Sequence, residues 1–123
     1  LNRLGRERLI RAEVVADPSR VGALALVVAP PPVPRTNIKD PVPCVATGTD
    51  ADGGSVVVVC SSGVDLDLVP FAADARAAHD GAHPGVGDGG SRLVIVTPCR
   101  DRLRVVDEIA DQLSQPAAFV SFD

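Results

Sequence analysis

Apolar runs without polar alternation dominate the second half of the chain. Residues 54–60 read Gly-Ser-Val-Val-Val-Val-Cys and residues 92–97 read Arg-Leu-Val-Ile-Val-Thr. An uninterrupted β-branched run is typical of a strand that is buried on both faces of a parallel sheet. A shorter apolar run at 117–122 indicates a third strand.

Between these runs, apolar residues recur at the spacing of a helix. One such segment covers residues 67–79, with Gly81 expected just beyond its end, and another covers residues 98–114. A strand, a helix and a second strand joined by short connections give parallel pairing with a right-handed crossover. Residues 54–122 therefore predict a parallel βαβαβ unit.

The first half of the chain predicts strands in a different arrangement. Residues 23–29 are a strand by composition, and residues 42–49 are another. The Asp-Ala-Asp-Gly turn at 50–53 joins the second of them to the 54–60 run as a hairpin. The predicted fold class is therefore α/β, with a mixed sheet that combines an N-terminal hairpin with the parallel C-terminal half.

Three further segments organise the chain, which we interpret as a single α/β domain over 1–123. Residues 6–16 fit either a helix or the first arm of a hairpin, and we favour the helix. The segment 30–43 holds six of the eleven prolines and is expected to be an extended connection. The segment 81–91 is a Gly-rich loop by composition.

Composition and charge narrow the classes of partner. The net charge is -4 and aromatic residues make up 2% of the chain. Nucleic-acid binding depends mainly on cations that contact phosphates and on aromatic stacking, so nucleic acid is not expected as a partner. No apolar stretch reaches the roughly 20 residues that a membrane helix requires, so no membrane association is expected.

The cysteines indicate a reducing compartment. Cys44, Cys60 and Cys99 are widely spaced and odd in number, unlike the even, dense set of a disulfide-stapled secreted module. We therefore expect a cytoplasmic protein.

Two short patterns resemble a dinucleotide-binding motif and a calcium loop, but their surroundings in the sequence do not fit either site. No cofactor or metal is therefore expected. Residues 85–90 satisfy Gly-x-Gly-x-x-Gly, but they follow a helix and precede a strand, the reverse of a dinucleotide-binding order. Asp50 and Asp52 lack the later ligands of a calcium loop and fit a turn better.

The order of elements over roughly residues 6 to 98, a helix, three strands, a helix and a strand, resembles that of restriction-endonuclease-like nucleases. The resemblance implies a Glu-x-Lys motif that helps to hold Mg²⁺ on the strand after the first acidic ligand. This chain has Val59-Cys60-Ser61 at that place. Metal-dependent cleavage is therefore not expected.

Polar residues follow the two central strands of the predicted parallel sheet. Ligands of such sheets bind beyond the carboxyl ends of the strands, where loops lead into helix N-termini. Hydroxyls, a thiol, a cation and helix-terminal amides at this edge suit a small anionic ligand. The predicted ligand-binding residues are Ser61, Ser62, Gly63, Asp67, Thr97, Cys99 and Arg100.

No complete catalytic constellation is present in the sequence, so we expect a non-catalytic accessory or interaction domain. The uncovered apolar strand at 117–122 suggests a homodimer. The alternative is a small enzyme, a hydrolase or nuclease-like, that acts near Cys99 at the N-terminus of a helix. His79 and His83 are expected at the other end of the sheet, in solvent.

Overall fold

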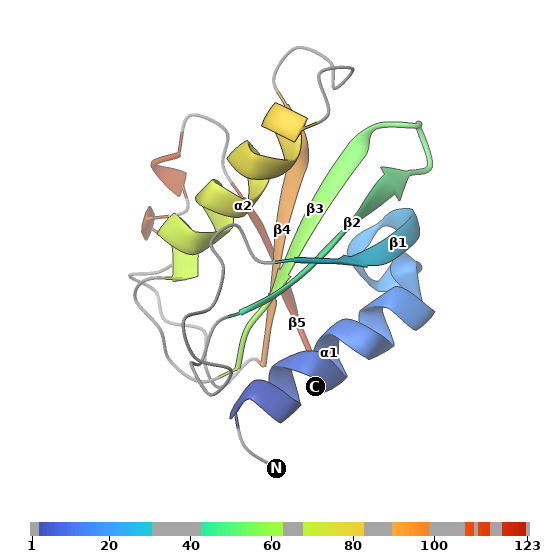
Figure 1. The fold of residues 1–123 in the computed structure, drawn as a ribbon, viewed down its shortest axis with the longest axis vertical. Helices are drawn as coiled ribbons and strands as arrows, with labels where there is room; N and C mark the ends of the chain where they lie inside the picture. The colour runs from blue at the N-terminus through green and yellow to red at the C-terminus, as the bar shows by residue number, and fades with distance from the viewer. Residues whose placement is uncertain are drawn as a thin grey trace.

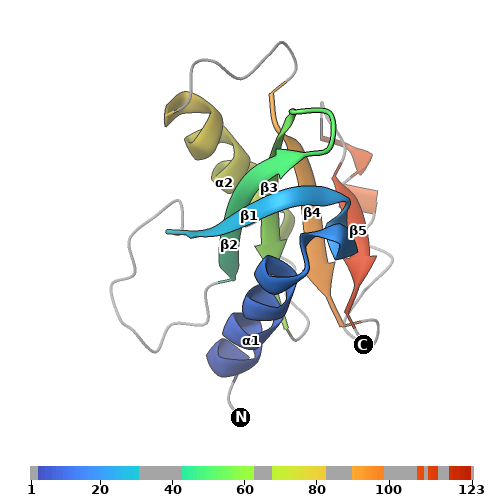
Figure 2. The same cartoon turned by 90° about the vertical axis from the view of Figure 1, so that its right-hand side faces the viewer.

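The computed structural model describes residues 3–30, 43–62, 68–82, 90–98, 108–109, 111–113 and 117–122. Its five strands form one mixed sheet in the order β1-β2-β3-β4-β5, with α1 and α2 on opposite faces (Figures 1 and 2). The elements are α1 (Arg3–Ala16), the 3-10 helix η1 (Pro18–Val21), β1 (Ala23–Ala29), β2 (Cys44–Asp50), β3 (Ser55–Cys60), α2 (Leu68–Ala82), β4 (Arg92–Thr97) and β5 (Ala118–Ser121).

The C-terminal half is parallel, as the sequence predicts. Val58 of β3 pairs with Val94 of β4, and Ile95 of β4 pairs with Phe119 of β5. The prediction of three parallel strands, which rested on uninterrupted apolar runs, is confirmed.

The N-terminal half is antiparallel, and the predicted hairpin is confirmed. The Asp50 carboxylate accepts hydrogen bonds from the amides of Asp52 (3.0 Å) and Gly54 (2.8 Å), which closes the turn between β2 and β3. Gly53 adopts φ +83°, a left-handed conformation that glycine takes without steric cost. The two aspartates thus serve the turn, as their spacing suggested.

The sheet separates two apolar layers because side chains alternate between its faces. Val56 and Val58 pack on the α1 side, whereas Val57 and Val59 pack on the α2 side. All four are fully buried. The central strand β3 is therefore enclosed on both faces, which explains why its sequence shows no alternation.

Residues 3–16 form a helix, so the alternative of a hairpin arm is wrong. Ile10 and Val14 of α1 lie on its buried face, against the sheet. The chain then turns through η1, and Gly22 ends that turn with φ 71°. β1 pairs with β2 so closely that a Cβ at Gly48 would stand 1.8 Å from the carbonyl oxygen of Ala25.

One predicted boundary is wrong, and several predictions lie outside the described residues. α2 continues through Gly81 to Ala82, because an exposed glycine near a helix end weakens the helix without breaking it. Of the predicted helix at 98–114, the structure describes helical backbone at Glu108, Ile109 and Asp111. Residues 31–42 of the proline-rich connection and 83–89 of the Gly-rich loop fall outside the described part.

None of the described helices is long and apolar enough to cross a membrane.

Candidate functional site

The predicted site lies at the carboxyl ends of β3 and β4. The structure describes Ser61, Ser62 and Thr97 there. Predicted residues Gly63, Asp67, Cys99 and Arg100 lie outside the described residues, as does His83.

Ser61 and Thr97 lie side by side at this edge. The Ser61 amide donates to the carbonyl oxygen of Val96 at 3.0 Å, which continues the pairing of β3 with β4 by one residue. Both hydroxyls are buried, and neither has a hydrogen-bond partner within the described part of the chain. The structure therefore brings together two of the predicted hydroxyls.

A buried carboxylate that the sequence analysis missed closes the α1 side of this edge. Glu7 of α1 is fully buried, and its Oε2 accepts a hydrogen bond from the Ser62 amide at 3.1 Å. Glu7 stands three residues before Ile10 and seven before Val14, on the apolar stripe of α1. That spacing is the signal by which it could have been found.

These contacts bear on the small anionic ligand. The amides of Ser61 and Ser62 both donate to protein acceptors, and the second acceptor is a carboxylate. An anion at this edge would have to draw on other donors and lie near the charge of Glu7. The anionic ligand stays a prediction that depends on residues outside the described ranges.

Arg11 follows Glu7 by one helical turn and fastens α1 to the sheet. Its Nη1 donates to the carbonyl oxygen of Val45 at 3.3 Å and to that of Ala29 at 3.5 Å. The guanidinium thereby links the end of β1 with the beginning of β2.

Two cysteines face each other beneath this part of α1. Cys44, the first residue of β2, is the register partner of Cys60, the last residue of β3, and both are buried. Burial, and after it the neighbouring Cys44 thiol, raises the pKa of Cys60 from 9.0 to about 12. Arg11 lowers this pKa and Glu7 raises it. The Cys60 thiol is therefore neutral at physiological pH and is a poor nucleophile.

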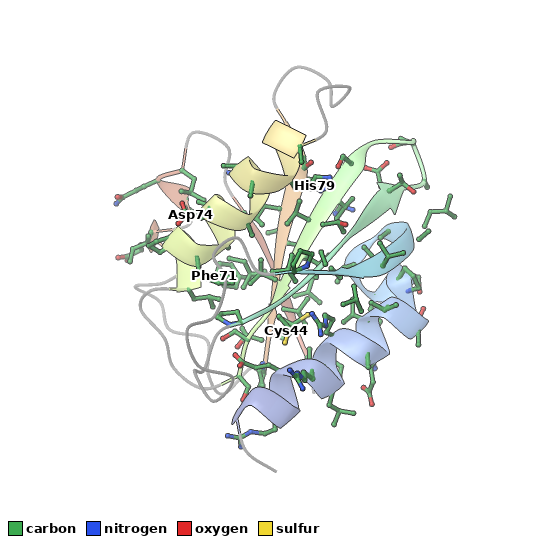
Figure 3. The ribbon with its side chains drawn as sticks, in the orientation of Figure 1. Cys44, Phe71, Asp74 and His79 are labelled. Carbon is green, nitrogen blue, oxygen red and sulfur yellow. The ribbon has the colours of Figure 1, made fainter. Side chains whose placement is uncertain are left out.

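A second polar cluster occupies the opposite end of β3 and β4. His79 Nε2 lies 3.0 Å from Ser55 Oγ, and Ser55 Oγ lies 2.7 Å from Ser91 Oγ. Ser91 Oγ in turn lies 2.5 Å from Asp80 Oδ1, and the Ser91 amide donates to Asp80 Oδ2 at 3.1 Å. His79 projects from the last turns of α2 toward the sheet (Figure 3). His79 thus lies at the other end of the sheet, as expected, but it is half-buried rather than fully solvated, because the crossover helix returns its C-terminal end to the start of β3.

The proton count decides what this cluster can do. The Asp80 carboxylate only accepts, so the single proton of the Ser91 hydroxyl goes to it. The Ser55 hydroxyl then donates to Ser91 Oγ. Ser55 Oγ is therefore the acceptor in its contact with His79, and Nε2–H of His79 is the donor. A histidine that donates to a serine cannot act as its base, so the pair is not arranged as a nucleophile with its general base.

A partly open pocket, lined by both polar and apolar atoms, lies between η1 and β5. Its lining includes Val21, Val96, Phe122 and one cation, Arg20. The Arg20 guanidinium stands 4.9 Å from the centroid of the Phe122 ring and 3.6 Å from the Glu13 carboxylate. Arg20, the only charged residue of the described lining, is therefore already in contact with Phe122 and Glu13.

No group of three or more His, Cys, Asp or Glu side chains within the described ranges is placed to hold a metal ion. Comparisons of the chain with models of protein families, with curated proteins and with solved structures find no match.

Proposed function

We propose that this chain is a non-catalytic interaction domain that associates with a second copy of itself along β1. The observation that carries the proposal is the exposure of apolar side chains on this strand. Leu24, Val27 and Val28 are 68%, 64% and 60% exposed. Within the described part of the chain β1 pairs with β2 alone, so its outer edge presents backbone donors and acceptors.

The sequence of β1 supports self-pairing in particular. The strand reads Ala-Leu-Ala-Leu-Val-Val-Ala, without a charge, a proline or a polar side chain. Natural edge strands are commonly protected by charges or prolines, and β1 has neither. Around a two-fold axis, an antiparallel pair of such strands places apolar side chains opposite apolar side chains in every register.

The other edge of the sheet is less suited to this role. The apolar run at 117–122 predicts a homodimer contact there, and β5 lies at an edge of the sheet that the described residues form. However, β5 has four residues where β1 has seven, and Val120 and Phe122 pack partly against the core. The exposed apolar side chains therefore favour β1 over β5 as the contact between the two copies.

The non-catalytic part of the proposal is supported by the two polar clusters. In the order of donors argued above, Ser55 accepts from His79 rather than donating to it, and the Cys60 thiol is neutral, so neither Ser55 nor Cys60 is an activated nucleophile. The alternative of a small enzyme acting near Cys99 rests on residues outside the described ranges. A cytoplasmic location belongs to the same proposal and is supported by the odd, widely spaced cysteines.

The association is tested by light scattering coupled to size-exclusion chromatography, from low to high micromolar protein. We expect twice the chain mass for the parent protein and the chain mass for Val27→Lys, because each dimer would bring two charges to the shared edge. Leu9→Lys is the matched control, since Leu9 is an exposed apolar residue on α1. A parent protein that stays monomeric at high micromolar concentration would overturn the proposal, as would a Val27→Lys variant that remains dimeric.

A further inference from the structure

We propose that Cys44 and Cys60 are a redox-modifiable pair that forms an intramolecular disulfide by exchange with a low-molecular-weight disulfide. The observation behind this proposal is their register. Cys44 and Cys60 are direct partners across the antiparallel β2–β3 pair. The inference is independent of the self-association along β1.

The Cα spacing expected of such a pair falls within the range that disulfides span. The Asp50 amide donates to the carbonyl oxygen of Gly54, and counting by two along the register makes Cys44 and Cys60 a hydrogen-bonded pair, whose Cα atoms are about 5.5 Å apart. Disulfides span Cα separations of about 4.4 to 6.8 Å. Both side chains lie on the α1 side of the sheet, in one core cluster (Cys44 is labelled in Figure 3).

The position of the two cysteines at strand ends allows a small disulfide to reach their sulfur atoms when the strands open locally. Cys44 begins β2 and Cys60 ends β3, so both belong to the same end of the hairpin, far from its turn. Strand ends open at lower free-energy cost than the middle of a sheet. A local opening that releases the Arg11 and Glu7 contacts would therefore expose the two sulfurs while Val57 and Val58 stay packed.

The exchange balances without any further reactant. One cysteine, as its thiolate, attacks a sulfur of the small disulfide and forms a mixed disulfide, and one small thiol leaves with the proton. The second cysteine attacks the cysteine sulfur of that mixed disulfide, and the second small thiol leaves with the second proton. Two protein thiols are oxidised and one small disulfide is reduced to two thiols.

The disulfide would join β2 and β3 at an end where side chains of α1 already bind both strands. Arg11 bonds the carbonyl oxygen of Val45, and Glu7 bonds the amide of Ser62, each next to or near one cysteine. Closing the segment from Cys44 to Cys60 restricts the unfolded chain, so oxidation should raise the melting temperature by roughly 10 °C.

The test uses the Cys99→Ser variant, which leaves the proposed pair in place and removes competing pairings. The variant is equilibrated with reduced and oxidised glutathione in different ratios, quenched with acid and alkylated, then digested and analysed by mass spectrometry. We expect a cross-linked peptide pair joining Cys44 to Cys60, together with the higher melting temperature. In the parent protein the same pair should dominate over pairs that include Cys99.

Two outcomes would overturn the proposal. One is glutathione adducts on single cysteines without the Cys44–Cys60 pair, and the other is oxidation to the pair without any gain in melting temperature. Cys44→Ala and Cys60→Ala serve as controls, because each should abolish the effect of glutathione on melting. If either variant does not fold, the peptide analysis of Cys99→Ser decides alone.

Discussion

Glu7 and Ser62 are 55 residues apart in sequence, and the Glu7 carboxylate accepts a buried hydrogen bond from the Ser62 amide, with 3.1 Å between nitrogen and oxygen. The contact joins the first turns of α1 to the segment that follows β3. A buried carboxylate is costly unless its oxygens receive hydrogen bonds, so this pair fixes where the start of α1 sits on the sheet.

Replacement of Glu7 tests that role. Glu7→Ala leaves the Ser62 amide without its acceptor and opens a small cavity, so we expect a loss of about 2 to 4 kcal/mol in the free energy of unfolding. Glu7→Gln keeps an acceptor of the same size and should lose less. Urea denaturation measures both, and equal losses for the two variants would contradict the hydrogen-bonding role.

Two glycines should respond to alanine in opposite directions. A Cβ at Gly48 would meet the Ala25 carbonyl oxygen at 1.8 Å and its carbon at 2.8 Å, so Gly48→Ala must separate β1 from β2. We expect a loss of about 3 kcal/mol or more, or no folding. A Cβ at Gly81 meets nothing within 4 Å, and Gly81→Ala in α2 should stabilise by about 0.5 to 1 kcal/mol. Thermal melting monitored by circular dichroism compares them.

The cluster at the end of α2 contributes to stability through Ser91. Ser91 is buried and its hydroxyl contacts Asp80 and Ser55, so Ser91→Ala, which keeps only the amide contact, should cost about 1 to 3 kcal/mol. Asp74→Asn is the control, because Asp74 is exposed on the same helix and its change should stay within about 0.5 kcal/mol (Figure 3). Chemical denaturation measures both, and similar stability of the two variants would contradict the importance of the cluster.

Alkaline pH should destabilise the protein through Cys60. Its pKa is 9.0 as an ordinary thiol and about 12 in the folded chain. Between these values the unfolded state loses the proton that the folded state retains, so stability falls as pH rises above 9.0, by at most about 1.4 kcal/mol per pH unit. Below that range the thiol contributes no pH dependence. Denaturation of the parent and Cys60→Ala from neutral pH to moderately alkaline pH should give a steeper decline for the parent.

The strands could be predicted from the sequence because the buried sheet imposes an apolar pattern of its own. The unbroken apolar run at Val56–Val59 indicates a strand whose two faces are both buried, and all four residues are buried. The pairing of Cys44 with Cys60 was within reach too, since counting back from the turn pair Asp50 and Gly54 places them opposite each other.

Glu7 and the cluster around His79 were harder to predict, for different reasons. A glutamate on a helix is normally assigned to the solvent face, and only its acceptor contact with the distant Ser62 amide explains its burial. The contact of His79 with Ser55 depends on the angle at which α2 crosses the sheet, which apolar spacing does not specify. Both depend on tertiary contacts, although the place of Glu7 on the apolar stripe of α1 is a signal in the local pattern.

The position of β3, between an antiparallel neighbour and a parallel one, also bears on the order in which the chain folds. Its pairing with β2 needs closure of one tight turn at Asp50–Gly54, whereas its pairing with β4 needs closure of a loop that contains all of α2. Loop closure makes distant pairings slow, so the β2–β3 hairpin should form first and β4 should add to it. Truncations such as Val58→Ala should therefore slow folding, whereas Leu26→Ala in β1 should mainly accelerate unfolding.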